Sequence, residues 1–288
     1  MDSVAKSSLQ RWTPHLAVKG SCKLSGFLKV SGAKNSALVL MAASILSEEE
    51  VRLRNIPLLT DIDVMINILN TLGIQTSRDK ENLIIKTQGV RPQPLPSELV
   101  NSLRASFFCI GPLLARFGKA EVPLPGGCQI GNRPIDEHIQ GLRKLGAIVE
   151  IKDSVVSASF AKNQNRLKGA NILLNCPSVG ATETILMAAV LSKGISKIKN
   201  AAQEPEIQDL ANMLNLMGAK IRGAGTSEIH IEGVSRLHGC THTVIPDRIE
   251  AGTFLIAAAI TRSSLIVGPI IKDHLYSVLK KLDDCGCT

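Results

Sequence analysis

The residues best suited to chemistry lie in one glycine-rich stretch, Leu124–Asp136, which reads LPGGCQIGNRPID. Proline and three glycines in so short a run exclude a regular helix or strand there. Cys128 is followed five residues later by Arg133 and then by Pro134, which suits the first position of a helix. A cation at a helix N-terminus favours a bound anion, and the same positive field lowers the pKa of a nearby thiol. The stretch therefore predicts a reactive cysteine beside an anion site, with an ordinary surface turn as the alternative.

Three further helix starts have the chemistry of anion sites. Lys34 stands in SGAKN and Arg104 in LRAS, each at the start of an apolar helix, and residues 177–182 form a neutral turn, PSVGAT, that enters a third. The first backbone N–H groups of a helix have no partner within the helix and can donate to phosphate oxygens. Together with Arg133, these starts favour a cluster of anion sites over separate solvated charges.

Composition and charge narrow the class of protein. A chain of 288 residues that is 44% hydrophobic can bury a large core and should form about two domains. Aromatic residues make up only 3%, which argues against a stacking surface for single-stranded nucleic acid. The net charge of +8 is spread along the chain, so we expect small anionic substrates and no nucleic acid, with a generally basic surface as the alternative.

The cysteines and histidines indicate the compartment and the absence of metal. The seven cysteines have no repeated spacing and no secretory signal precedes them, which is typical of reduced thiols in a cytoplasm-like compartment. No apolar run approaches the length of a membrane span. The histidines lack ligand spacing, and His138 is expected to be an ordinary residue on a polar helix face. We therefore expect a cytoplasmic monomer that uses no metal, no cofactor and no membrane.

The elements that must position these residues come from an internal repeat. A helical pattern that ends in glycine occurs four times, and Gly73, Gly146, Gly218 and Gly286 lie 73, 72 and 68 residues apart. A more apolar helix and a short strand precede each pattern, and two alternating strands follow the first three. The repeat predicts an α/β fold in which the apolar helices are buried.

The repeat also predicts the domain organisation. Copies one to three would form one complete domain, residues 34–245, and residues 1–33 plus 246–288 an incomplete second one. The fourth copy stops at Thr288, where its siblings continue into a hairpin. Because an unpaired sheet edge exposes backbone groups, we expect a chain that is incomplete at its C-terminus, with a repeat lost in evolution as the alternative. The helix 252–261 would then face water, so residues beyond about 246 should be sensitive to protease.

The motifs of the chain resemble those of the UDP-N-acetylglucosamine 1-carboxyvinyltransferases, the enolpyruvyl transferases of peptidoglycan synthesis. They occur in register and in order over nearly all of the chain from residue 15 onward, and read SGAKNSAL, LRAS, LPGGCQIGNRPIDEHI, SVGATE, EPEIQDL and PDRIEAGTFL. The resemblance implies an inside-out α/β barrel of repeated βαβαββ units, two domains, and an active site in the cleft between them.

The resemblance also implies a reaction and a role for each residue. The enolpyruvyl group of phosphoenolpyruvate would move to the 3′-hydroxyl of UDP-N-acetylglucosamine. Cys128 would be the general acid at the methylene carbon and could form a covalent adduct there, whereas Lys34, Arg104 and Arg133 would hold the phosphate of phosphoenolpyruvate. The implied substrate-binding residues are Asn35, Pro134, Ile135, Asp136, Glu137, Ser178, Val179 and Gly180.

The resemblance also concerns four further residues and the C-terminal end of the chain. Asp247 and Arg248 would lie where the chain crosses between the domains, and this chain has Cys176 and Pro177 where some members of the family carry a basic residue. The family chain continues past residue 288, and its base carboxylate and further phosphate-binding arginines lie there, so the 288-residue chain is expected to be inactive alone. A non-catalytic remnant that binds a UDP-sugar or a partner is the alternative. An enzyme like 5-enolpyruvylshikimate-3-phosphate synthase, which has no such cysteine loop, is a further one.

Overall fold

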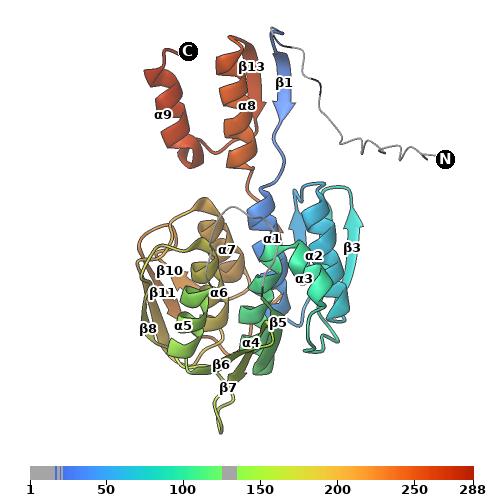
Figure 1. Cartoon of the computed structure of the whole chain (residues 1–288), viewed down its shortest axis with the longest axis vertical. Helices are drawn as coiled ribbons and strands as arrows, with labels where there is room; N and C mark the ends of the chain where they lie inside the picture. The colour runs from blue at the N-terminus through green and yellow to red at the C-terminus, as the bar shows by residue number, and fades with distance from the viewer. Residues whose placement is uncertain (1–16, 18–19, 21, 125–134) are drawn as a thin grey trace, which may run out of the picture.

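The structure is a computed structural model that describes residues 17, 20, 22–124 and 135–288. Cys128, Arg133 and Pro134, which carry the first prediction from the sequence, lie outside the described residues. The described chain forms a larger body, joined by two neighbouring segments to a smaller body that contains the C-terminus (Figure 1).

Three successive units build the larger body, as the repeat predicts. The first contains α1 (Lys34–Ala43), the 3-10 turn η1 (Ser44–Leu46), β2 (Val51–Arg54), α2 (Thr60–Thr71), β3 (Gln75–Asp79) and β4 (Asn82–Lys86). The second contains α3 (Ser97–Ser102), the 3-10 segment η2 (Arg104–Cys109), α4 (Ile110–Phe117), β5 (Lys119–Pro123), α5 (Asp136–Lys144), β6 (Ala147–Lys152) and β7 (Val155–Phe160). The third contains β8 (Asn171–Leu173), α6 (Val179–Ala189), β9 (Ile195–Lys199), α7 (Pro205–Leu216), β10 (Lys220–Arg222), β11 (Glu228–Glu232) and then β12 (Thr241–Thr243).

Each unit contributes one sheet. Within the described residues the strand orders are β12-β2-β4-β3, β5-β7-β6 and β10-β11-β9-β8. In the third unit β8 leads and runs parallel to β9. In the first sheet the equivalent place beside β2 is taken by β12, which comes from the far end of the larger body, with Thr241 opposite Arg52. The last strand of this body therefore completes its first sheet.

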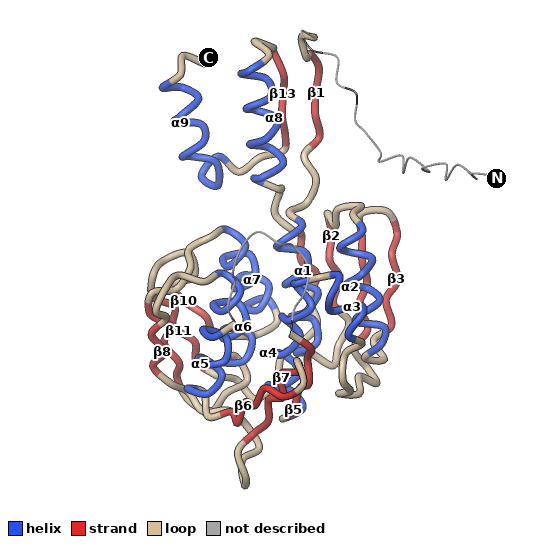
Figure 2. Tube along the Cα trace, in the orientation of Figure 1, coloured by secondary structure: helices blue, strands red, loops and turns tan. Residues whose placement is uncertain are grey.

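Helices fill the interior of the larger body and the sheets lie outside them, as Figure 2 shows. α1 is buried from Ser36 to Ala43 and α6 from Ala181 to Ala189. Such helices are apolar on nearly every side, so they are stable only when other helices surround them. This arrangement is the inside-out α/β fold that the sequence predicts.

The turns after the amphipathic helices follow the sequence prediction closely. Gly73, Gly146, Gly218 and Gly286 all have positive φ values, between 81° and 98°. A left-handed residue just past the last helical turn lets the chain leave the helix while the last carbonyls are still satisfied, and glycine adopts it without a Cβ clash.

One predicted helix begins differently. The sequence predicts a single apolar helix that starts at Arg104, but the structure has the 3-10 segment η2 before α4. Pro112 explains the change, because its ring clashes with the carbonyl four residues earlier and it has no N–H to donate. An α-helix that starts at Ile110 places Pro112 in the first turn, where both defects are tolerated.

The smaller body contains β1 (Ser25–Lys29), α8 (Arg248–Ile260), β13 (Ser264–Gly268), the 3-10 turn η3 (Lys272–Leu275) and α9 (Tyr276–Asp284). β1 and β13 pair in parallel, and the buried centre consists of Val30, Ala251 and Leu275. α8 is as apolar as α1, yet its Ile256 is 51% and its Ile260 81% exposed. The general prediction that the apolar helices are buried is therefore wrong for α8. Its exposure agrees with the expectation that helix 252–261 faces water, because this body has too few elements to cover it.

Two antiparallel segments connect the bodies. Gly32 forms a bridge with Pro246, the Ala33 N–H donates to the Ile245 carbonyl at 2.8 Å, and the Asp247 N–H donates to the Ser31 carbonyl at 2.8 Å. We propose residues 34–245 as one domain and the described residues on either side as part of a second. The large core cluster, which runs from Ala33 to Val244, supports this division.

Among the described residues, no helix is long and apolar enough to cross a membrane.

Candidate functional site

Lys34 begins α1 at the point where the two connecting segments meet. Its backbone N–H donates to Asp247 Oδ2 at 3.2 Å, and its Nζ lies 2.7 Å from Asp61 Oδ2 on α2. Both side chains of this ion pair are 39% exposed, so the ammonium group remains open to an additional anion. Asn35 follows it and is exposed. Asp61 was not singled out from the sequence, since a carboxylate 27 residues away has no local signal.

Arg104 is the first residue of η2 and lies near a histidine that the sequence analysis misjudged. His138 on α5 is 7% exposed, not a residue of a polar face. Its ring packs edge-on against Phe107, with centroids 5.2 Å apart, and its Nδ1 lies 2.9 Å from Thr184 Oγ1 on α6. Burial, together with the smaller effect of the positive charge of Arg104, lowers the pKa of His138 to about 3. The imidazole is therefore neutral and adds no charge beside Arg104.

The buried imidazole predicts a defined pH dependence of stability. Between pH 6.5 and 3 the unfolded chain binds a proton at His138 that the folded chain does not bind, so stability falls as the pH falls below 6.5. Between pH 7 and 5 the wild type should lose about 2 kcal/mol more than His138→Gln, which cannot take up this proton. Urea unfolding of both proteins at the two pH values measures the difference. Equal losses would show that protonation of His138 is not coupled to folding.

The first turn of α5 is tied to the loop before α6. Ile135 precedes α5, and Asp136 begins it with an exposed side chain. Glu137 is half-buried, and its carboxylate accepts from the Asn175 backbone N–H at 3.1 Å and from Asn175 Nδ2 at 2.8 Å. This contact orders the chain just before the exposed Cys176 and Pro177.

The N-terminus of α6 has the form that the sequence predicts. The Ser178 side chain caps the helix, because its Oγ accepts from the Ala181 N–H at 3.3 Å. Val179 and Gly180 form the first turn and are half-buried. A Cβ on Gly180 would lie 3.1 Å from His138 Cε1, so the helix start and the imidazole are in close contact. His138 thus brings together the starts of η2, α5 and α6, which contain most of the described residues that the sequence predicts.

The described thiols include two that are poorly suited to chemistry. Burial raises the pKa of Cys109 to about 12 and that of Cys240 to about 11, so both remain thiols at neutral pH. Cys128 lies outside the described residues, and its predicted reactivity stays a prediction.

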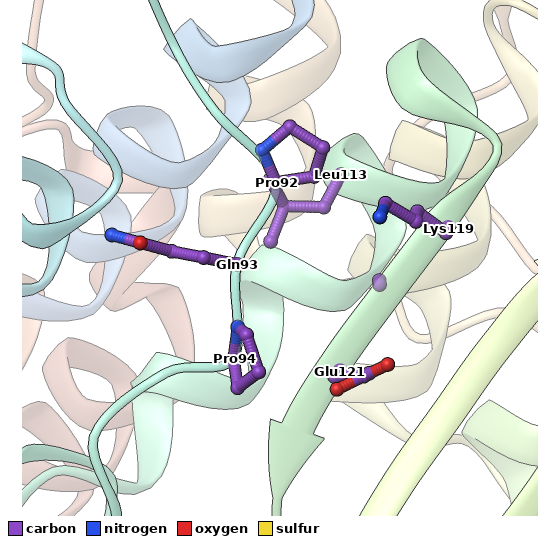
Figure 3. Close-up of a pocket in the computed structure, with 7 residues that line it drawn as sticks. Pro92, Gln93, Pro94, Leu113, Lys119 and Glu121 are labelled. Atoms are coloured by element: carbon purple, nitrogen blue, oxygen red, sulfur yellow. The ribbon is translucent and has the colours of Figure 1, made fainter.

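The described residues of the site contain no cluster of metal ligands. No group of three or more His, Cys, Asp or Glu side chains there is placed to hold a metal ion. A shallow pocket lies elsewhere, between the proline-rich segment after β4 and strand β5, and it contains none of the predicted residues (Figure 3). Its lining consists of Pro92, Gln93, Pro94, Leu113, Lys119, Ala120 and Glu121.

The fold and these helix starts define a class. Residues 18–288 match the family model described as EPSP synthase (3-phosphoshikimate 1-carboxyvinyltransferase), and the chain belongs to this family of enolpyruvyl transferases. Within it, the chain is 60% identical over 288 residues to the UDP-N-acetylglucosamine 1-carboxyvinyltransferase of Prochlorococcus marinus strain MIT 9313. It is 59% identical over 289 residues to that of Synechococcus sp. strain CC9605.

The coverage of these matches is unequal. Each match includes the whole of this chain. It includes only 66% of the MIT 9313 relative and 67% of the CC9605 relative, and a third relative, from Prochlorococcus marinus strain NATL2A, is covered to 63%. The chain therefore spans about two thirds of the length of the curated relatives it matches.

Solved structures support the fold. The enolpyruvyl transferase NikO from Streptomyces tendae superposes with a TM-score of 0.77 at 23% identity, over 91% of this chain and 62% of that one. An EPSP synthase from Acinetobacter baumannii gives 0.71 at 19% identity, over 92% and 60%. At these identities the likeness concerns the fold alone.

Proposed function

We propose that this chain provides part of the site of an enzyme that transfers the enolpyruvyl group of phosphoenolpyruvate to the 3′-hydroxyl of UDP-N-acetylglucosamine. The observation that carries this proposal is the 60% identity over all 288 residues to a relative that bears the name of this reaction. The reaction would be a step of peptidoglycan synthesis in the cytoplasm. The chain would act as a monomer without a metal or cofactor.

The phosphate of phosphoenolpyruvate would be held by Lys34, Arg104 and Arg133. Two geometric features support this role: Lys34 heads α1 with a half-exposed ammonium group, and Arg104 heads η2 beside a neutral histidine. Because the imidazole is neutral, the positive charge at this helix start comes from the guanidinium group of Arg104. Cys128 would donate the proton at the methylene carbon.

The UDP part would lie against α5 and α6. The backbone N–H groups of Val179 and Gly180 head α6, where they have no partner within the helix and can donate to diphosphate oxygens. Ser178 fixes this turn through its capping bond. Asn35, Pro134, Ile135, Asp136 and Glu137 would complete the contacts to the sugar nucleotide.

Ligand choice tests the proposal directly. UDP-N-acetylglucosamine should bind the 288-residue chain in calorimetry, whereas shikimate 3-phosphate should not, because all of the contacts proposed here for the UDP part come from this chain. Binding of shikimate 3-phosphate alone would assign the chain to the other branch of the family. Release of phosphate from phosphoenolpyruvate with UDP-N-acetylglucosamine would show that this chain is catalytically sufficient, and its absence beside intact binding would show that further residues are required.

A matched pair of lysines tests the phosphate site. Lys34→Ala should weaken phosphoenolpyruvate binding, measured in the presence of UDP-N-acetylglucosamine, by about 2 kcal/mol, the scale of a charge-assisted hydrogen bond. Lys29→Ala is the control, since Lys29 also pairs with a carboxylate, Glu81 at 2.6 Å, but lies on β1. If the two variants bound phosphoenolpyruvate with equal affinity, Lys34 would not be part of the phosphate site.

A further inference from the structure

We propose that Asp209 is a positioning residue for this site, because its buried carboxylate holds both the Lys34 helix and the segment that leads to Asp247. Asp209 lies on α7 and is 2% exposed. It is not among the residues predicted from the sequence to contact substrate, and it would act only through the residues it holds.

The carboxylate receives donors from three separate elements. Ser36 Oγ on α1 donates to Oδ2 at 2.5 Å. His242 Nε2 on β12 donates to Oδ1 at 2.7 Å, and the Ile245 N–H donates to Oδ2 at 3.4 Å. A buried carboxylate is stable only when such donors replace its water, and each donor is in turn fixed by it. Asp209 therefore ties α1, β12 and the second connecting segment to α7.

These donors are adjacent in sequence to site residues. Ser36 is two residues after Lys34, and Ile245 is two residues before Asp247. Asp247 closes the loop of contacts, because its Oδ2 accepts from the Lys34 N–H at 3.2 Å. The same carboxylate caps α8 through its Oδ1, which accepts from the Ile249 and Glu250 N–H groups at 2.8 and 3.0 Å. The carboxylates of Asp209 and Asp247 together therefore hold the first turn of α1, which carries Lys34.

A second contact from the same helix strengthens the link. Glu206 lies one turn before Asp209, on the same face of α7, and its carboxylate is 3.2 Å from Arg248 Nε and 3.3 Å from Arg248 Nη2. One face of α7 therefore contacts the second connecting segment at Ile245 and the start of α8 at Arg248, and it contacts α1 through Ser36.

The test compares two buried serines. Ser36→Ala removes the donor to Asp209. Ser44→Ala is the control, because Ser44 is equally buried but its hydroxyl donates to the Leu40 carbonyl at the end of the adjoining helix α1, at 2.9 Å. Amide hydrogen exchange of the full chain at residues 33–36 and 245–249 should become about tenfold faster in Ser36→Ala, the effect of losing one bond to a charged acceptor, and should not change in Ser44→Ala. Asp209→Ala should give a larger increase at the same residues.

The role in positioning rests on the proposed function, so affinity is measured separately. Phosphoenolpyruvate affinity in the presence of UDP-N-acetylglucosamine should fall about tenfold in Ser36→Ala and stay at the wild-type value in Ser44→Ala, at equal thermal stability of the two variants. Equal exchange in the two serine variants would overturn the anchoring, and unchanged affinity in Ser36→Ala would overturn the positioning role. If the wild type binds neither substrate, the proposed function fails, and the positioning role fails with it even where the exchange pattern holds.

Discussion

Gly32→Ala is expected to destabilise the protein by about 3 kcal/mol, because there is no space for a side chain where the two connecting segments cross. A Cβ at Gly32 would lie 1.7 Å from the Asn55 carbonyl oxygen and 2.9 Å from its carbon. Asn55 cannot retreat easily, since its Nδ2 donates to the Val244 carbonyl at 2.9 Å and its backbone is left-handed, with φ of 60°. Gly32 itself is held by its bridge to Pro246.

The measurement is the urea midpoint of the variant against that of the wild type. Gly252→Ala is the matched control, because a Cβ there would be in ordinary contact at 3.5 Å from Leu275 Cδ2. Within α8, alanine is favoured over glycine by about 1 kcal/mol, so this control should lose nothing. If the urea midpoint of Gly32→Ala were as high as that of Gly252→Ala, the structure could accommodate a Cβ at Gly32, and the expected clash with Asn55 would be wrong.

Glu183→Gln is expected to stabilise the protein, and increasingly so as the pH rises. Glu183 on α6 is 2% exposed, and its Oε2 has no hydrogen-bond partner among the described residues. Burial raises the pKa of this carboxyl well above its usual value of 4.5, and the negative charges of Glu206 and Glu204 raise it further. The folded state therefore binds a proton that the unfolded state releases above pH 4.5. Stability is full below pH 4.5 and falls as the pH rises towards the folded pKa.

The expected advantage of Glu183→Gln should grow by more than about 1 kcal/mol between pH 5 and pH 8, since glutamine is neutral in both states. Urea unfolding at the two pH values gives the free energies. Glu183→Leu should show the same change with pH, although its stability at pH 5 can differ through packing. A constant difference between wild type and both variants would show that Glu183 is solvated or paired in solution.

Much of the fold could be predicted because the signals are local. The strands β2, β5, β9 and β13 and the helices around them follow from apolar periods of two and 3.6 residues, and the glycines that end α2, α5, α7 and α9 mark their own positions. The start of α4 after η2 could also have been predicted locally, because Pro112 disfavours a continuous helix there, but the apolar pattern alone indicated one helix. The turn at residues 177–182 that enters α6 was also predicted from local residues, whereas the Ser178 cap is seen only in the structure.

The remaining features depend on distant contacts. His138 reads as polar in its own helix, and only the packing of Phe107 and Gly180 around it makes it a buried neutral group. The partner of Lys34 is Asp61, on another helix. Such properties belong to the arrangement of elements, which a repeat pattern alone does not specify in detail.

The pairing of β12 with β2 also determines when this protein can finish folding on the ribosome. Arg52 leaves the ribosome early, but its partner Thr241 is almost at the end of the larger body. At about 5 to 20 residues per second, the edge of β2 waits roughly 10 to 40 seconds for its neighbour. During this time its backbone groups are a template for pairing with another nascent strand. Of the three units of the larger body, the first to be synthesised is thus the last to be closed, and for that period its open sheet edge is exposed to misassembly.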